Sequence, residues 1–155
     1  MRGLMRSCRT FFSLLAVISP LLFAGCTTNQ IEMKNLNAPL VDLQKATHKN
    51  MPAGTMKVST NGREFFSNYF VVAPNGRFVK SKYPPKRYRA HVFILGDRRP
   101  YNIVVRVAVQ LRNSDGDYDT DHFNKGMARV ISRRIQITLH ESLEQRNFID
   151  DFRAF

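Results

Sequence analysis

Strict alternation of apolar and polar residues marks two strands near the middle of the chain. One runs from Arg87 to Leu95 and the other from Tyr101 to Arg112. Such period-two alternation is typical of strands with one buried face. The segment between them, 96–100, contains Gly96 and Pro100 and predicts a turn, so the two strands form an antiparallel hairpin. The alternating apolar positions are Tyr88, Ala90, Val92, Ile94, Ile103, Val105, Val107, Val109 and Leu111.

The register of this hairpin follows from the requirement that both apolar sets meet on one face. The predicted apolar pairs are Ile94 with Ile103, Val92 with Val105, and Ala90 with Val107. The opposite face pairs His91 with Arg106 and Arg89 with Ala108, and it also carries Arg87, Gln110 and Arg112. We therefore predict a sheet with one apolar side and one cationic side.

Turn signals before the hairpin predict three shorter strands. Asn61-Gly62 favours a two-residue turn between strands at 56–58 and 65–72. Pro74-Asn75-Gly76 predicts a reversal before a third strand at 77–79, and the prolines at 84 and 85 end that strand because proline has no amide hydrogen to donate. Together with the long hairpin, these strands predict an antiparallel meander of about five strands.

An apolar stripe predicts one long helix from Phe123 to about Leu143. Asp119 or Thr120 is a suitable N-cap, and carboxylates near the first turn interact favourably with the helix dipole. A spacing of four residues makes the stripe drift by about 40° at each step, so the helix either crosses a twisted sheet obliquely or contacts something else with its last turns. The stripe consists of Phe123, Met127, Ile131, Ile135, Leu139 and Leu143.

These elements predict an α+β domain, with the long C-terminal helix packed on one face of the meander. The domain is expected to span residues 54–147. Residues 26–53 are mostly polar and are interpreted as a flexible tether, with a short helix from Leu40 to Thr47 as the alternative. The aromatic tail, 148–155, either packs onto the core or forms an exposed patch for a partner.

The first 26 residues have the organisation of a bacterial export signal. A basic region with Arg2, Arg6 and Arg9 precedes an apolar run from Phe11 to Phe23. That run of 13 residues is shorter than the roughly 20 that a membrane-spanning helix requires. It leads into Leu22-Phe23-Ala24-Gly25-Cys26, which resembles the lipobox of bacterial lipoproteins. The resemblance implies that residues 1–25 are removed and that Cys26 becomes an acylated N-terminus.

This resemblance also has consequences for location and chemistry. Two or more acyl chains on Cys26 would hold the protein stably at a membrane. Thr27, where an aspartate would direct retention in the inner membrane, favours the periplasmic face of the outer membrane, with inner-membrane anchoring as the alternative. Cys8 lies in the signal segment, so the mature chain would have no thiol for a disulfide, a nucleophile or a metal. We expect no cofactor besides the covalent lipid.

Positive charge is concentrated around the predicted hairpin. The chain has 24 Lys and Arg against 12 Asp and Glu, and removing the three signal arginines leaves 21 basic residues and a net charge of +9. Residues 77–112 hold ten basic residues and one acid, Asp97. Arginine suits phosphate and carboxylate because its planar guanidinium bonds both in a bidentate manner. The candidates for binding an anion or a partner are Arg87, Arg89, Arg98, Arg99, Arg106 and Arg112, with Tyr83, Tyr88 and Tyr101 interleaved.

An exported protein is not expected to bind nucleic acid, so the anticipated anions are those of the cell envelope. They are lipopolysaccharide, peptidoglycan or an acidic protein. The favoured function is a non-catalytic binding or scaffolding module. The alternative is that the cationic side of the sheet is an ordinary solvated surface that binds nothing specific. A lipopolysaccharide-assembly or transport accessory lipoprotein is a further alternative by analogy of fold and charge. A small periplasmic hydrolase is disfavoured because no catalytic motif supports it.

An acidic run offers one weak candidate for a metal site. It contains Asp115, Asp117 and Asp119, which supply oxygen ligands of the kind that calcium prefers. An EF-hand loop starting at Asn113 needs glycine at its sixth position and glutamate at its twelfth, where the chain has Tyr118 and Asn124. We therefore predict a solvated turn and no metal. Nor can His122 and His140 share an ion, because they would stand about 27 Å apart on one helix.

Overall fold

The structure is a computed structural model that describes residues 29–153, with side chains described up to Arg146. The expected signal segment, Cys26 and the side chains of the aromatic tail lie outside this part. The strands are β1 (Ile31–Leu36), β2 (Thr55–Val58), β3 (Glu64–Ser67), β4 (Val71–Val72), β5 (Phe78–Val79), β6 (Lys86–Leu95), β7 (Tyr101–Arg112) and β8 (Tyr118–Phe123). The helices are α2 (Leu40–Lys49) and α3 (Lys125–Arg153).

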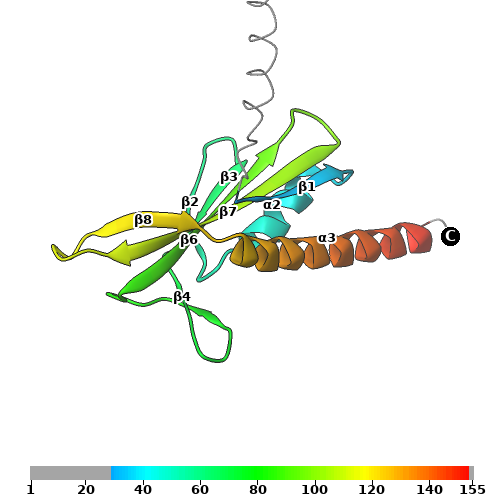
Figure 1. Cartoon of the computed structure of the whole chain (residues 1–155). Helices are drawn as coiled ribbons and strands as arrows, with labels where there is room; N and C mark the ends of the chain where they lie inside the picture. The colour runs from blue at the N-terminus through cyan, green and yellow to red at the C-terminus, as the bar shows by residue number, and fades with distance from the viewer. Residues whose placement is uncertain (1–28, 154–155) are drawn as a thin grey trace, which may run out of the picture.

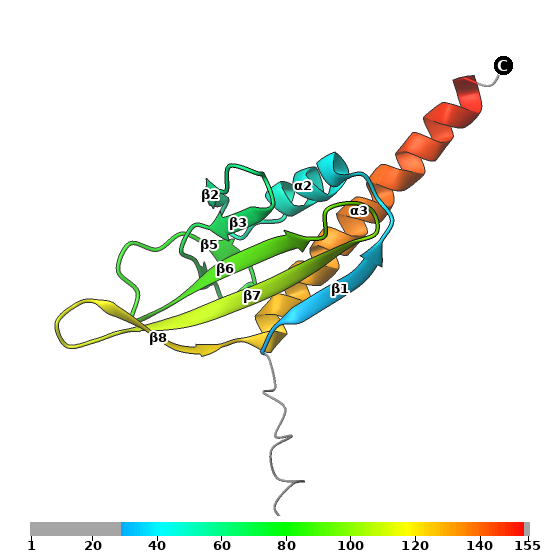
Figure 2. The same cartoon turned by 90° about the horizontal axis from the view of Figure 1, so that it is seen from above.

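One antiparallel sheet forms a layer of the molecule, and the helices form a second layer on one side of it (Figure 1). The strand order is β1-β7-β6-β3-β2, and β8 also pairs with β7. Strand β1 pairs with residues 101–105 of β7 and β8 with residues 108–112, so they follow each other along one edge of β7. In Figure 2 the sheet is seen with α3 behind it. The predicted α+β class, antiparallel sheet and covering C-terminal helix are confirmed.

The long hairpin has the predicted register at every pair. Ile94 is opposite Ile103 and Val92 opposite Val105, and on the other face His91 is opposite Arg106. Ala90, Val92, Ile94, Ile103, Val105, Val107 and Val109 are almost fully buried, whereas Tyr88 is partly buried and Leu111, at the end of β7, is exposed. Gly96, in the turn, has a φ of +106°, a value that side chains with a Cβ rarely adopt. Burial of one face therefore determines the register of the hairpin, as expected from the alternation.

Helix α3 buries its apolar stripe against the sheet and α2. Ile131, Ile135 and Leu139 are buried, and Met127 and Leu143 pack at the two ends of the stripe. The C-terminal turns of α3 extend beyond the edge of the sheet (Figures 1 and 2). The helix continues to Arg153, past the predicted end near Leu143 and the predicted domain boundary at 147. Among the described helices, none is long and apolar enough to cross a membrane.

The predicted start of α3 is wrong. Its N-cap is Asn124, whose side-chain oxygen accepts a hydrogen bond from the Met127 amide at 2.9 Å. Asp119, Thr120 and Phe123, which were expected to cap or begin the helix, lie in β8 instead. The first part of the acidic run, Asp115 and Asp117, forms the turn between β7 and β8. The residues from Tyr118 to Phe123 then pair with β7 before the helix begins.

The predicted tether is also wrong for residues 31–49, which form β1 and α2. Ile31 and Met33 pair with β7 and pack on the core, while Leu43 and Ala46 of α2 are fully buried. The alternative of a short helix at 40–47 is therefore correct, and the helix is two residues longer. Asp42 forms a salt bridge with Arg146, which joins α2 to α3. A few well-spaced apolar side chains suffice here because the sheet edge and α3 offer them a surface.

The five-strand meander is correct in outline but not in detail. Strands β2 and β3 form a hairpin, with the Ser59 amide donating to the Glu64 carbonyl, so the loop is longer than the predicted two-residue turn. The segment 65–72 is divided into β3 and β4, and β4 pairs with β5 in a separate small sheet. This small sheet packs through Phe70 and Phe78, whose ring centroids are 5.1 Å apart. Strand β3 therefore pairs directly with β6.

The burial of α2 generates a test of its place in the fold. We expect Leu43→Ala to lower the free energy of unfolding by about 2–5 kcal/mol, because Leu43 is fully buried and its truncation leaves a cavity. The matched control is Val41→Ala on the same helix, where the side chain is 54% exposed and the change should stay within about 0.5 kcal/mol. Urea unfolding of the two variants measures both values. Equally small changes would mean that residues 40–49 are not part of the folded core.

Candidate functional site

The side of the sheet away from the helices carries a mixed array of cations and rings, here called the cationic face. No described helix covers this side (Figure 2). Alternate residues of β6 and β7 point to it, and β3 and β8 flank them. The cationic face consists of Arg87, Arg89, His91, Arg106 and Arg112 together with Phe66, Tyr69, Phe93 and Tyr118.

Arg87 is held between two phenol rings. Its guanidinium carbon lies 3.7 Å from the ring centroid of Tyr69 and 3.5 Å from that of Tyr118. Its Nε donates to the side-chain oxygen of Gln110 at 2.8 Å, and the Tyr118 hydroxyl donates to the Pro84 carbonyl at 2.6 Å. Stacking on both faces fixes the plane of the guanidinium while its charge stays unneutralised.

Arg89 lies next to Arg87 along β6 and also rests against rings. Its guanidinium carbon is 5.0 Å from the Phe66 centroid and 5.2 Å from the Tyr69 centroid. Its Nη1 is 3.4 Å from the Tyr69 hydroxyl oxygen, a long hydrogen bond. The Nε atom is buried and has no hydrogen-bond partner among the described residues, which carries a free-energy cost. Because Nε is buried, a ligand would reach this guanidinium through its Nη atoms.

His91 occupies the centre of the cationic face between two phenylalanines. Its ring centroid is 3.9 Å from that of Phe66 and 3.8 Å from that of Phe93. The Nε2 atom lies 2.8 Å from Glu64 Oε1. Burial lowers the pKa of His91 below 6.5; the hydrogen bond and charge of Glu64 act in the opposite direction, and the positive charges of Arg106 and Arg89 lower it further.

The other predicted arginines are divided between the cationic face and its ends. Arg106 is exposed near the Phe93 ring, and its Nε donates to Gln30 Oε1 at 2.6 Å. Arg112 lies at the far end of β7, where its Nε donates to the Gly116 carbonyl at 3.2 Å. Arg98 and Arg99 are in the β6–β7 turn, at the opposite end of the twelve-residue strand β7 from Arg112, about 36 Å away along the strand. The structure thus brings Arg87, Arg89 and Arg106 together and separates Arg98 and Arg99 from them.

The aromatic partners of these arginines differ from those that the sequence indicated. Tyr88 and Tyr101 point to the helix side: Tyr88 stacks on Phe70, and Tyr101 is buried. Of the three interleaved tyrosines only Tyr83 approaches a cation of the cationic face, with the Arg112 guanidinium carbon 5.6 Å from its centroid. Phe93 could have been recognised, because it is two residues from His91 and so shares its face. Phe66, Tyr69 and Tyr118 depend on pairing between distant segments.

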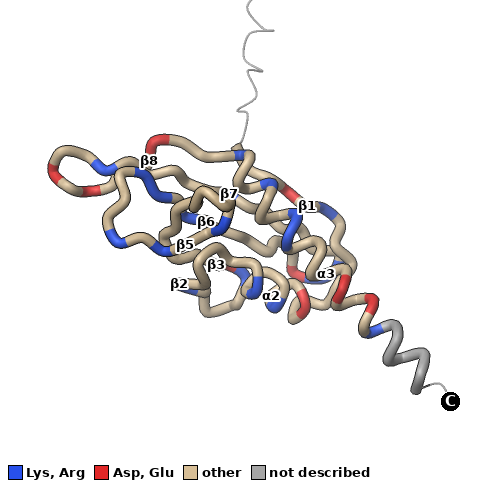
Figure 3. The backbone as a smooth tube through the Cα atoms, turned by 90° about the horizontal axis from the view of Figure 1, so that it is seen from below, with Lys and Arg blue, Asp and Glu red and all other residues tan. Residues whose placement is uncertain are grey.

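The electrostatics of the cationic face favour anion binding. None of Arg87, Arg89, Arg106 and Arg112 forms a salt bridge with a carboxylate of the described residues. Figure 3 shows basic positions along the hairpin and acidic positions at the tip of the β7–β8 turn. Guanidinium groups held by rings keep their outward N–H donors for a phosphate or carboxylate. The chemistry on offer is therefore recognition of an anion by charge and hydrogen bonds.

The acidic turn has an internal hydrogen-bonding pattern of its own. The Asp117 amide donates to Asn113 Oδ1 at 2.8 Å, and Asn113 Nδ2 donates to Asp119 Oδ2 at 3.2 Å. Asp115, Asp117 and Asp119 do not form a metal-binding group: among the side chains described, those of residues 29–146, no three of His, Cys, Asp or Glu are placed to hold a metal ion. His122 lies in β8, not on α3 with His140 as predicted, and bonds to Asp121.

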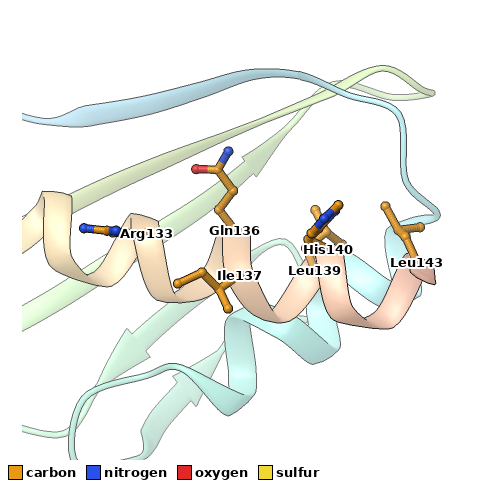
Figure 4. A pocket seen from close by; sticks show the side chains of 6 residues that line it. All are labelled: Arg133, Gln136, Ile137, Leu139, His140 and Leu143. Carbon is orange, nitrogen blue, oxygen red and sulfur yellow. The ribbon is translucent and has the colours of Figure 1, made fainter. Parts of the chain in front are cut away.

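A shallow hollow of about 470 Å³ lies along α3 on the helix side of the molecule (Figure 4). All of its lining side chains come from α3, and in this view Gln136 and Ile137 extend to opposite sides of the helix. Arg133 and His140 are its charged or titratable residues. Because the lining comes from one helix, its polar groups do not converge, and the cationic face remains the better candidate site.

The lowered pKa of His91 predicts a pH dependence of stability. A histidine that binds a proton more weakly in the folded state makes the free energy of unfolding fall as the pH drops below about 6.5 and through the folded-state pKa. We expect His91→Phe, which keeps the ring stack, to flatten this acid decline. Urea unfolding of both proteins between about pH 7.5 and 5 measures the difference. Parallel curves would contradict the assignment, since the other described histidines are common to both proteins.

Comparisons with protein-family models, curated proteins and solved structures found no significant match to this chain.

Proposed function

We propose that this protein is a lipid-anchored, non-catalytic module of the bacterial envelope whose cationic face docks an anionic envelope component or an acidic partner protein. The observation that carries the proposal is the array of arginines on a sheet side that no described helix covers. Aromatic rings hold Arg87 and Arg89 in place, and no described carboxylate neutralises them. A surface that served only for solubility would not need stacked guanidinium groups.

The geometry near the N-terminus supports action close to a membrane. Gln30 is bonded to Arg106, and β1 begins at Ile31. If Cys26 is acylated, only three residues lie between it and Gln30. The four steps along the chain span at most about 14 Å when extended. The cationic face would therefore lie near the head groups of the bilayer, and not at the end of the long flexible tether that residues 26–53 would have formed. The favoured location is the periplasmic face of the outer membrane, and inner-membrane anchoring stays the alternative.

The chemistry of the cationic face favours lipopolysaccharide phosphates over the other envelope anions. Phosphates on a packed membrane surface are multiple and close together, which matches Arg87, Arg89 and Arg106 on neighbouring strands. Peptidoglycan carboxylates and an acidic protein are the alternative anionic ligands of the cationic face. No nucleic acid and no cofactor besides the lipid on Cys26 enter the proposal. A role in lipopolysaccharide assembly or transport would be one form of this function.

Binding to lipopolysaccharide micelles tests the proposal. Each basic residue near an anionic surface contributes about 1 kcal/mol, so changing Arg87, Arg89 and Arg106 together to Ala should weaken binding about 100-fold at low salt. High salt should reduce the difference by screening. The matched control changes Lys80, Arg98 and Arg99 to Ala, which removes the same charge away from the cationic face. Equal losses in the two triple variants would mean that only net charge matters and would overturn the proposal.

The lipid anchor has its own test. Mass spectrometry of the protein from its native membranes should find a chain that begins at Cys26 and carries acyl groups. We expect the Cys26→Ser variant to keep residues 1–25 and to carry no lipid, because the acylated thiol is lost. A wild-type chain without added lipid mass would contradict the anchor while leaving the binding experiment valid.

A further inference from the structure

A groove between α2 and the β2–β3 hairpin forms a second surface with a distinct chemistry, here called the α2 groove. Its volume is about 580 Å³, within the range of small-molecule sites. From its lining and charge we propose that the α2 groove binds a single-chain amphiphile with an anionic head group, such as a fatty acid or an alkyl phosphate. This site is separate from the cationic face and does not depend on the function proposed for it.

The floor of the α2 groove is apolar. Phe65 and Val58 are paired across β3 and β2, so their side chains lie on the same side of the sheet. Phe65 belongs to the core and is 3% exposed, whereas Val58 is 40% exposed on an edge strand. Hydrocarbon laid over this floor would remove the exposed apolar surface of Val58 from water, which favours binding in proportion to the area covered.

One contact fixes the two walls of the α2 groove relative to each other. Gln44 of α2 donates from Nε2 to the Gly62 carbonyl at 3.0 Å. Gly62 has a φ of +65°, and a Cβ on it would lie 2.5 Å from Gln44 Nε2. The positive φ favours glycine at this position, and a Cβ there would displace the Gln44 amide from its hydrogen bond. This bond links the helix to the hairpin before any ligand binds.

The rim of the α2 groove is cationic. Lys45 and Lys49, one turn apart on α2, line it together with His48, and all three residues are exposed. Neither lysine is in a salt bridge with a described carboxylate, and the lining has no acidic residue. Lysine stems extend the apolar wall while their ammonium groups stay in water. A ligand with a hydrocarbon chain and a negative head would satisfy both parts.

The edge of β2 favours an amphiphile over a peptide strand. A peptide that extended the sheet would need an unbroken edge for its hydrogen bonds. Strand β2 has only four residues, and its register shifts between Thr55 and Lys57. Such an irregularity on an edge strand hinders the addition of another strand. The hydrocarbon contacts of an acyl chain do not depend on that register.

Photo-crosslinking with the full chain in its membranes tests this inference. The probe is a diazirine-labelled dodecanoate, and the neutral control is the corresponding dodecanol. We expect dodecanoate to label peptides of α2 and the β2–β3 hairpin, and dodecanol to label them about tenfold less, a ratio equivalent to 1.4 kcal/mol. Changing Lys45 and Lys49 to Gln should reduce dodecanoate labelling to the level of dodecanol. Val58→Asp should abolish labelling by placing a charge on the floor.

The matched control changes Lys80 and Lys82 to Gln, which removes the same charge from an exposed segment outside the α2 groove. This variant should label like the wild type, and circular dichroism should show that every variant is folded. Equal labelling by both probes, labelling outside the α2 groove, or an equal loss in the two lysine variants would overturn the inference. Protection of the α2 groove by an acidic peptide but not by free dodecanoate would also overturn it. Arginine variants of the cationic face should leave the labelling unchanged.

Discussion

The rest of the structure depends on the burial of one face of the β6–β7 hairpin. Its apolar side chains pack beneath α3, and the pleat then forces the alternate residues to the opposite side. The strand register that buries the apolar residues in the core therefore also keeps the arginines of β6 and β7 out of it. A shift of one residue would bury guanidinium groups and expose valines, so the folding energy of the domain also maintains the arrangement of the cationic face.

Aromatic rings take the place that carboxylates usually have beside arginine. A salt bridge would orient Arg87 equally well but would neutralise it. The rings of Tyr69 and Tyr118 constrain the guanidinium through its two faces and leave its charge and its edge for a ligand. Glu64 is a carboxylate on this side of the sheet, but it pairs with His91 and with no described arginine. Its negative charge there partly offsets the positive potential of the neighbouring Arg89 and Arg106. The cationic face therefore holds its arginines in fixed positions without neutralising their charge.

Sequence alone predicted the elements whose signal is long and local. Ten or more alternating residues fix β6 and β7, and the buried residues of α3 repeat over several turns. It favoured a tether and held α2 only as the alternative, because only Leu43 and Ala46 among the apolar residues of this segment are fully buried in the core. Strand β8 was missed because nearly all its residues are exposed and only pairing with β7 defines it.

The candidate site was predictable only in its charges. The side of the sheet on which Arg87, Arg89 and Arg106 lie follows from the alternation. Phe66 comes from β3, whose pairing with β6 skips the β4–β5 hairpin; Tyr69 lies between β3 and β4, and Tyr118 lies in the exposed strand β8. The alternation of β6 and β7 does not indicate any of these three positions. The α2 groove was not predicted either, since it lies between the hairpin and a helix that the sequence offered only as the alternative to a tether.

The position of β1 gives the molecule a mechanical property. This strand is the first described element, it lies at the sheet edge, and among the described strands it pairs with β7 alone. A pull on the N-terminus would load the β1–β7 ladder first and could peel β1 away while the β6–β7 hairpin and α3 stayed packed. Gln30 would be withdrawn from Arg106 in the same movement. If the N-terminus is anchored and a partner is held on the cationic face, as we propose, tension between them would act on the edge of the sheet before it reached the core.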